Sequence, residues 1–181
     1  MITIREARKE DAAQIVSVYD QTWQATYEPL LKEDDLQEVT STEHRKIMWE
    51  TVLQSSTHRV YVVDSEESGV VGFLSGGKER TENFNFDCEI YDIYIHPNHQ
   101  RNGYGKMLVE AFVKDCYTNG NQSLLVWILT DNPFGDFYVR LGASVVEAEN
   151  VTIGKGTYQE TAYGWTSIEV LIDRLKLSEQ C

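Results

Sequence analysis

The chain has 181 residues, 41% of them hydrophobic, and its 29 acidic residues outnumber its 16 lysines and arginines, giving a formal net charge of -13. This length and composition predict a single domain over residues 1–181 with a full hydrophobic core. A negative field disfavours nucleic acid and anionic membranes as partners, because both require clustered positive charge. It would attract cationic substrates such as amines, and it is equally compatible with a role in solubility alone.

The N-terminus and the cysteines indicate a cytoplasmic protein. The first segment, "MITIREARKEDAAQIV", is charged from Arg5 onward and lacks the apolar stretch of a signal peptide. No window is apolar for long enough to cross a bilayer. Cys88, Cys116 and Cys181 are odd in number and scattered in spacing, which fits a reducing compartment rather than a disulfide framework.

The N-terminal third is predicted to form a strand and two helices. Residues 1–7 alternate apolar with polar side chains, as a half-buried strand does. Apolar residues then follow helical spacing at Ala12, Ile15, Val16, Tyr19 and Trp23, which predicts a helix with one buried face. A second amphipathic helix is expected over 40–56. There Thr40 and Glu43 have capping-box spacing, and Met48 and Val52 lie on the apolar side.

The remaining chain is predicted to alternate between strands and helices. Residues 58–64 and 69–77 are β-branched runs separated by "SEESG", which indicates a hairpin, and 86–97 reads as a long strand stopped by Pro97. A helix marked by Met107, Leu108, Ala111 and Phe112 follows, and then an unbroken apolar strand over 124–130. A short helix over 133–140 and strands over 144–149 and 157–167 close the order. The strand–helix–strand unit at its centre implies two parallel strands in a mixed sheet.

The stretch Gln100-Arg101-Asn102-Gly103-Tyr104-Gly105 lies between a predicted strand and a predicted helix and indicates an anion site. The first N–H groups of a helix lack intrahelical partners, and the helix dipole adds partial positive charge there. Gly103 and Gly105 permit positive φ and remove Cβ atoms that would block an anion. Arg101 and Lys106 add charge at the rim, and such local, fixed donors can work inside an acidic protein.

Three phosphate-bearing ligands compete for this loop. A P-loop requires Ser or Thr after Gly-Lys, but Met107 follows Lys106. A dinucleotide fingerprint requires a third glycine where the chain has Leu108, and it would normally follow the first strand of its domain. Coenzyme A, through its pyrophosphate, is the third candidate. A bare left-handed turn would explain one glycine but not two.

At this point the chain resembles the GNAT superfamily of acyl-CoA-dependent N-acetyltransferases, whose signature Gln/Arg-x-x-Gly-x-Gly/Ala is met by Gln100 to Gly105. "EIYDIYIHPNHQ" resembles the fourth strand of that family, and "LTDNPFGDFYVRLGA" the end of its fifth strand and the following helix. "TWQATYEPLL" is similar to the substrate-side helices of a bacterial, small-molecule branch. The resemblance covers nearly the whole chain. It implies an α/β domain with a mixed, mostly antiparallel sheet, whose splayed central parallel strand pair is flanked by helices.

The resemblance also implies acetyl-CoA as co-substrate, without a metal. In this family the pantetheine arm lies between the splayed strands, so backbone groups of Ile93, Tyr94 and Ile95 would pair with it. The N–H of Ile95 would face the thioester oxygen. Asn132 would bind the pantetheine amide, although "TDNP" is equally a turn before a helix. The full set of implied cofactor contacts is Ile93, Tyr94, Ile95, Arg101, Asn102, Gly103, Tyr104, Gly105, Lys106 and Asn132.

Two side chains are candidates for proton transfer. Glu89 is the candidate general base, because an acid in an apolar strand is costly unless it has a role, and the family often carries Glu at this distance from the loop. Strict alternation would give it the same face as Tyr91, Ile93 and Ile95. Asp92, kept in reserve, would then face the other way unless a β-bulge intervenes. Tyr138 matches the family's tyrosine and is the candidate general acid for the departing thiolate.

Two further pairs carry weaker signals. Trp23 and Tyr27 are four residues apart, so they could line an acceptor pocket or pack in the core. His96 and His99 flank Pro97, but no Cys or carboxylate lies beside them at ligand spacing, so no metal site is predicted.

The sequence therefore predicts an N-acetyltransferase that moves an acetyl group from acetyl-CoA directly to a primary amine, with a small molecule as acceptor. A protein N-terminus or lysine is the alternative acceptor. A non-catalytic acyl-CoA-binding sensor is the alternative from another class, and a homodimer would be compatible with this fold.

Overall fold

A seven-stranded sheet forms the centre of the computed structural model, which describes residues 1–36 and 42–177. The strand order is β1-β2-β3-β4-β5-β7-β6. All neighbours are antiparallel except β4 and β5, which are parallel. This confirms the predicted mixed sheet. The strands are β1 (Ile2–Glu6), β2 (His58–Ser65), β3 (Gly69–Lys78), β4 (Cys88–Ile95), β5 (Leu124–Leu129), β6 (Ser144–Ile153) and β7 (Gly156–Trp165).

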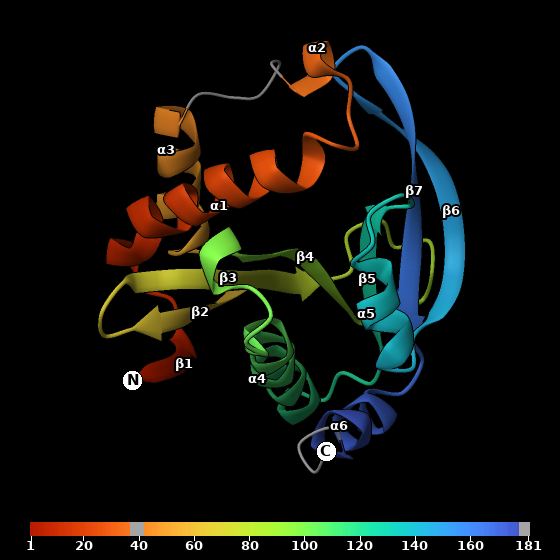
Figure 1. The fold of residues 1–181 in the computed structure, drawn as a ribbon. Helices are drawn as coiled ribbons and strands as arrows, with labels where there is room; N and C mark the ends of the chain where they lie inside the picture. The colour runs from red at the N-terminus through yellow and green to blue at the C-terminus, as the bar shows by residue number, and fades with distance from the viewer. Residues whose placement is uncertain (37–41, 178–181) are drawn as a thin grey trace.

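Helices cover both faces of the sheet (Figure 1). One face of β2, β3 and β4, here called the α1 face, carries α1 (Ala12–Tyr27) and α3 (Thr42–Val52); the opposite α4 face carries α4 (Tyr104–Thr118), with α6 (Ile168–Leu177) beyond it. The short helices α2 (Glu33–Leu36) and α5 (Gly135–Arg140) lie near the tip of β6–β7 and against β7, respectively. Within the described ranges, no helix combines the length and apolar character that a membrane span requires.

Two apolar clusters fill the space between helices and sheet. On the α4 face, Phe112 and Leu108 of α4 pack with Leu74 and Ile90. A Cβ added at Gly76 would overlap the ring of Phe112, so glycine at this position lets α4 approach β3 closely. On the α1 face the cluster is built from Ile15, Val16, Trp49, Val62 and Phe73.

Several element details differ from the sequence prediction. Of the two residues predicted on the apolar side of α3, Val52 packs against the cluster on the α1 face, whereas Met48 is 46% exposed and its neighbour Trp49, 3% exposed, is buried instead. Helix α5 begins at Gly135 rather than at Pro133, because a turn precedes it. Helices α2 and α6 were not predicted. Thr40, and with it the predicted capping box, lies outside the described residues, as does Cys181.

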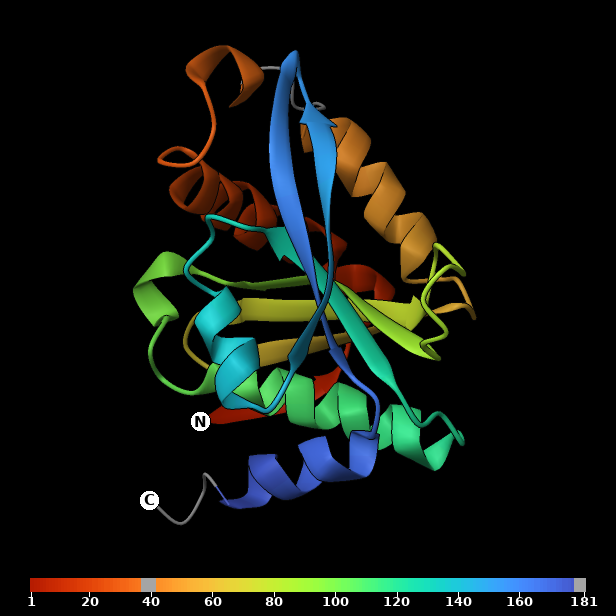
Figure 2. The ribbon, with the colours of Figure 1, turned by 90° about the vertical axis from the view of Figure 1, so that its right-hand side faces the viewer.

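The β6–β7 hairpin is long, and its tip reaches the segment that follows α1 (Figure 2). The carboxylate of Asp35 in α2 accepts hydrogen bonds from the backbone N of Lys155 (2.9 Å), the backbone N of Gly156 (3.1 Å) and the hydroxyl of Tyr158 (2.5 Å). A Cβ at Gly154 or Gly156 would collide with Asp35. This Asp35 contact fixes the hairpin tip beside the end of α1.

Candidate active site

The central parallel strands separate along their length. β4 and β5 pair only at Cys88–Leu124, Glu89–Leu125 and Ile90–Val126. β4 nevertheless continues to Ile95, and β5 continues to Leu129 while pairing with β7. The space between 91–95 and 127–129 is the β4–β5 gap, in which each strand has an edge without a neighbour in the sheet. This confirms the splayed pair predicted from the sequence.

Alternate residues of β4 offer their backbone groups to the gap. The N–H of His96 donates to the carbonyl of Val71 at 2.9 Å, which fixes the alternation of the antiparallel β3–β4 ladder. By that alternation Ile93 and Ile95 direct their N–H and C=O groups away from β3, into the gap. Tyr94, which was also expected to serve the ligand through its backbone, directs these groups toward β3.

The carbonyl of Ile95 already has two donors. It accepts hydrogen bonds from Thr22 Oγ1 at 3.3 Å and from Gln100 Nε2 at 3.0 Å. The N–H of Ile95 and both backbone groups of Ile93 are therefore the groups of this edge that a ligand could pair with.

A β-bulge interrupts β4 where the gap begins. In the register with β3, Asp92 lies opposite Ser75 and Ile90 lies opposite Gly76, so Tyr91 is an extra residue without an opposite partner. An extra residue reverses the alternation of side chains beyond it.

The bulge rearranges the two faces of β4. The residues that pack in the α4-face cluster are Cys88, Ile90, Ile93 and Ile95. Glu89, Asp92 and Tyr94 consequently share the α1 face, where Tyr94 packs against the second cluster. The expectation that Glu89 shares a face with Ile93 and Ile95 is wrong for this reason, and Asp92 joins Glu89 instead.

Glu89 is held by an arginine that was not singled out from the sequence. Its side chain is buried, Oε1 accepts from Arg80 Nη2 at 2.7 Å, and Oε2 accepts from the backbone N of Arg80 at 3.0 Å. The guanidinium of Arg80 also lies over the ring of Tyr91, 4.0 Å from its centroid. Each carboxylate oxygen has two lone pairs, so both oxygens of Glu89 can accept one further hydrogen bond.

Asp92 lies among tyrosines and has a single hydrogen bond within the described chain, from Ser75 Oγ to Oδ2 at 2.8 Å. Burial raises the pKa of Asp92, and the bond from Ser75 opposes that rise. The rings of Tyr19 and Tyr94 are 5.3 Å apart edge-to-face on the same side of the sheet. Oδ1 of Asp92 is thus free to accept from a ligand.

Tyr138 is fully buried, and its hydroxyl finds no hydrogen-bond partner in the described part of the chain. Its ring packs against Phe134, Phe137, Tyr163 and Trp165. Burial raises the pKa of Tyr138 well above its ordinary value, and the hydroxyl of Tyr27 adds to the rise. A buried hydroxyl without a partner costs about 1–3 kcal/mol, so this atom marks a position where a ligand group would be stabilising.

The glycine loop leaves the start of α4 open. Gly103 has φ +79° and is the N-cap, so no side chain caps the helix, and Met107 donates the first intrahelical bond to the carbonyl of Gly103 at 3.1 Å. The N–H groups of the three residues before Met107 are therefore available to an anion. Arg101 also has positive φ, at 62°. Neither Arg101 nor Lys106 forms an ion pair within residues 1–36 and 42–177.

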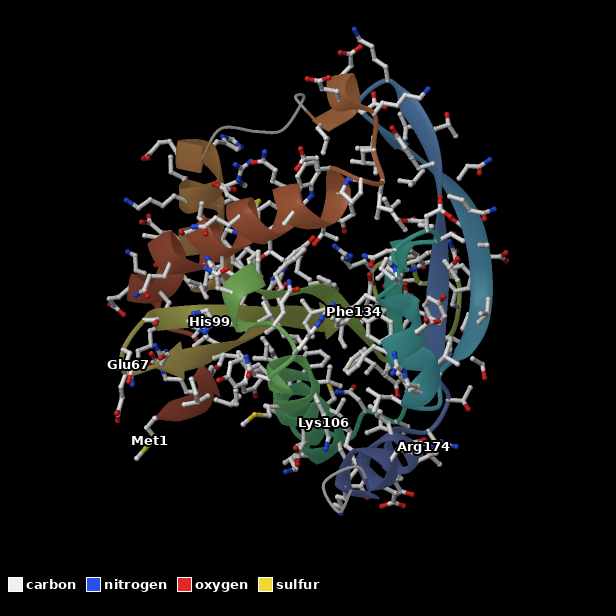
Figure 3. All side chains as sticks on the ribbon, in the orientation of Figure 1. Met1, Glu67, His99, Lys106, Phe134 and Arg174 are labelled. Atoms are coloured by element: carbon white, nitrogen blue, oxygen red, sulfur yellow. The ribbon has the colours of Figure 1, made fainter. Side chains whose placement is uncertain are left out.

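Gly105 has a different role from Gly103. It lies inside α4 without positive φ, and the nearest atom to an added Cβ is Phe134 Cζ at 3.8 Å. Packing within the protein therefore does not require glycine here, whereas a ligand resting on the loop would. Figure 3 shows Lys106 on α4 and Phe134 just before α5.

The remaining predicted site residues have local partners. Asn132 Oδ1 accepts from the backbone N of Phe134 at 3.0 Å, so this side chain stabilises the turn before α5. Trp23 and Tyr27 stack with centroids 5.0 Å apart at the end of α1. His96 bonds Gln21 at 2.6 Å, and the described residues contain no group of three or more His, Cys, Asp or Glu side chains that could hold a metal.

A comparison with family models matches residues 15–143 to the acetyltransferase (GNAT) family. The chain belongs to this family. It is 30% identical over 94% of its length to YuaI of Bacillus subtilis, an uncharacterized N-acetyltransferase of which 96% is covered. It is 29% identical to MnaT of Escherichia coli, an L-amino acid N-acyltransferase, over 72% of each chain. The chain is therefore an N-acetyltransferase of the GNAT type.

Solved structures share the fold. A PaiA N-acetyltransferase from Thermoplasma acidophilum in complex with coenzyme A has a TM-score of 0.70 and 19% identity, over 88% of this chain and 98% of that one. The acetyltransferase YncA from Salmonella typhimurium, solved with acetyl-CoA, has a TM-score of 0.68 and 24% identity, over 91% and 93%. At these identities the likeness concerns the fold.

Proposed function

We propose that this protein transfers the acetyl group of acetyl-CoA directly to a primary amine of a small molecule. The observation that carries the proposal is the β4–β5 gap, together with the uncapped start of α4 and a Tyr138 hydroxyl that has no partner in the described chain. Solved relatives of the same fold contain coenzyme A or acetyl-CoA, and the family is one of acetyltransferases.

The residues of the loop and the gap fit coenzyme A. The N–H groups of Tyr104, Gly105 and Lys106, with Arg101 and Asn102 beside them, would hold the pyrophosphate at the start of α4. Backbone groups of Ile93 and Ile95 would pair with the pantetheine arm, as a neighbouring strand would. The side-chain amide of Asn132 would bind an arm carbonyl while its oxygen keeps the turn.

Three groups of the chain would carry the chemistry. When bound, acetyl-CoA supplies the activated acetyl group. The N–H of Ile95 would donate to the carbonyl oxygen as the amine nitrogen forms its bond to the carbonyl carbon. Glu89 would take the proton that the amine loses, and Tyr138 would give a proton to sulfur as the carbon–sulfur bond breaks. Because the oxygens of Glu89 already face Arg80, a bridging water would carry the proton to Glu89.

The first experiment is calorimetric titration with acetyl-CoA, using ATP and NAD as controls. We expect acetyl-CoA alone to bind, and amines then to release free thiol from it. Preference for ATP or NAD would contradict the pyrophosphate assignment. Binding without thiol release for any amine would instead favour a non-catalytic sensor.

The assigned roles are tested by Glu89→Gln and Tyr138→Phe. Each variant should lower turnover while keeping the affinity for acetyl-CoA, since neither side chain holds the cofactor. Unchanged turnover in both variants would refute the catalytic assignment.

A further inference from the structure

The α1 face of the β4–β5 gap carries carboxylates from both sides. Glu89 and Asp92 come from β4. Glu160 comes from β7, opposite Leu129 of β5. In β5, Leu124 and Val126 pack in the α4-face cluster, so the alternate row that contains Leu129 faces α1. Cross-strand partners share a face, so Glu160 lies on the same face as Glu89 and Asp92.

Two of these three carboxylates form no ion pair in the described chain, so one arginine side chain faces three acids. Arg80 pairs with Glu89, and Arg45, the arginine near Tyr19, pairs with Asp20. Neither Asp92 nor Glu160 forms an ion pair there, but the charge of Arg80 acts on both, and that of His58 acts on Asp92.

The surroundings disfavour these charges. Burial raises the pKa of Glu160, the charges of Glu149 and Glu89 raise it further, and the charge of Arg80 opposes the rise. Burial likewise raises the pKa of Asp92. Partly buried carboxylates without an ion-pair partner are costly, so a bound cation would stabilise the charged form of both.

Aromatic side chains complete the surface. Burial raises the pKa of Tyr27, and its hydrogen bond with Tyr94 lowers it. The charges of Asp92 and Glu160 both act on Tyr27 and raise its pKa further. Trp23 stacks on Tyr27 at 5.0 Å. Tyr138, whose ring packs in the α4-face cluster, brings a fully buried hydroxyl without a partner in the described chain, and burial, followed by the hydroxyl of Tyr27, raises its pKa. Aromatic rings beside carboxylates favour alkylammonium groups.

We propose that the acceptor is a dication without a carboxylate, of the α,ω-diamine or polyamine class. Its second ammonium lies between Asp92 and Glu160 while its reacting amine lies near Glu89. This inference rests on the acetyl transfer proposed above. A carboxylate on the acceptor would meet Asp92 and Glu160, and Arg80 is already committed to Glu89. The chain would thereby differ from MnaT, which is named for L-amino acids.

The test compares three amines of matched length: putrescine, butylamine, which lacks the second amine, and ornithine, which adds a carboxylate to putrescine. Thiol release is measured at saturating acetyl-CoA. We expect kcat/KM for putrescine to exceed that for each of the others by about tenfold or more, which corresponds to about 1.4 kcal/mol. Equal use of butylamine, or preference for ornithine, would overturn the inference.

Variants then test the subsite itself. Glu160→Gln and, independently, Asp92→Asn should reduce the ratio of kcat/KM for putrescine over butylamine toward one. Asp173→Asn, on the exposed side of α6, removes the same charge far from the gap and should keep the ratio. A ratio that stays at the wild-type value in both subsite variants would contradict the inference.

Failure of the underlying function has a different signature. If acetyl-CoA does not bind in calorimetry, or if no primary amine, these three included, releases thiol, the proposed transfer itself is overturned. If acetyl-CoA binds and the amines react without preference for putrescine, the transfer stands and only the dication subsite falls.

Discussion

The two halves of β4 have different environments although they belong to one strand. Residues 88–90 have hydrogen-bonded neighbours on both sides, whereas 91–95 have one only on the β3 side. The change occurs at Tyr91, where the bulge also reverses the side-chain faces. The backbone of the first half is paired on both sides, and the backbone of the second half leaves one edge to the gap. The comparison teaches that the free backbone edge of residues 91–95 arises because β5 diverges from β4, and no additional helix or strand is required.

An unpaired strand edge is ordinarily a site of aggregation, and proteins cover or interrupt it. Here the edge lies in the middle of the sheet, where α1 and α5 flank the gap (Figure 1). A ligand with amide groups can therefore complete the ladder while another chain cannot easily reach it.

The largest effect is expected on the affinity for acetyl-CoA, from a bulky side chain in the glycine loop that follows the second half of β4. Gly105→Val adds side-chain atoms where the protein has only Phe134 within 4 Å of an added Cβ, so the fold should tolerate it while the pyrophosphate is displaced. Affinity for acetyl-CoA in calorimetry should fall about a thousandfold, or about 4 kcal/mol. Met107→Val, which places the same residue two positions further along α4, is the control and should keep its affinity. Unaltered binding by Gly105→Val would contradict the loop assignment.

The next largest effect is expected on the stability of the core that packs against the first half of β4, residues 88–90. Phe112 is fully buried and packs against β3 at Gly76 on the α4 face. Phe112→Ala should lower the free energy of unfolding by about 3–5 kcal/mol, because a large cavity remains. Denaturant titration measures this change. A loss of less than about 1 kcal/mol would mean that the first half does not depend on this packing.

A smaller effect on stability, with the opposite sign, is expected in the gap. Tyr138→Phe removes a buried hydroxyl that has no partner in the described chain, so stability should stay constant or rise by about 1 kcal/mol. Turnover should nevertheless fall by about a hundredfold if the hydroxyl protonates sulfur. Tyr163→Phe, on the neighbouring ring, serves as the control for turnover. Loss of stability with full activity in Tyr138→Phe would reverse the assignment.

The smallest effect concerns the tip of the β6–β7 hairpin, which Asp35 holds. The hydrogen bond from Tyr158, followed by that from the Lys155 N–H, lowers the pKa of Asp35 below its ordinary value. A lowered folded-state pKa means that the stabilisation is complete above the unfolded pKa of about 3.9, and is lost as the pH falls through the folded pKa.

Thermal unfolding against pH measures this contribution. The difference between wild type and Asp35→Asn should be constant between about pH 5 and pH 8 and should shrink below about pH 4. A difference that grows on acidification would contradict the sign derived for Asp35.

Most elements were predictable because their signals are local. The alternation of residues 1–7, the β-branched runs and the Gln100–Gly105 motif each depend on near neighbours in the chain, and all lie where expected. Helix α6 carries a visible signal too, since Ile168, Leu171, Ile172 and Leu175 follow helical spacing. That helix could have been found from sequence.

The site was less predictable because its geometry depends on pairing between distant segments. The bulge at Tyr91 exists only relative to Ser75 and Gly76 of β3, so nothing within β4 reveals that Asp92 joins Glu89. Glu160 reaches the same face only through the register of β7 on β5. Arg80 lies in an irregular loop, and its bond to Glu89 follows no periodicity.

The backbone character of the gap edge also bears on how this enzyme can diverge. Ile93 and Ile95 would bind acetyl-CoA through their backbone N–H and C=O groups. Every non-proline residue has these groups, so binding of the acetyl donor tolerates most substitutions at these two positions. The acceptor amine, by contrast, would be recognised by side chains such as those of Asp92 and Glu160. Mutation can therefore exchange one acceptor for another while the donor site is inherited unchanged, even where neighbouring residues of β4 contribute to both.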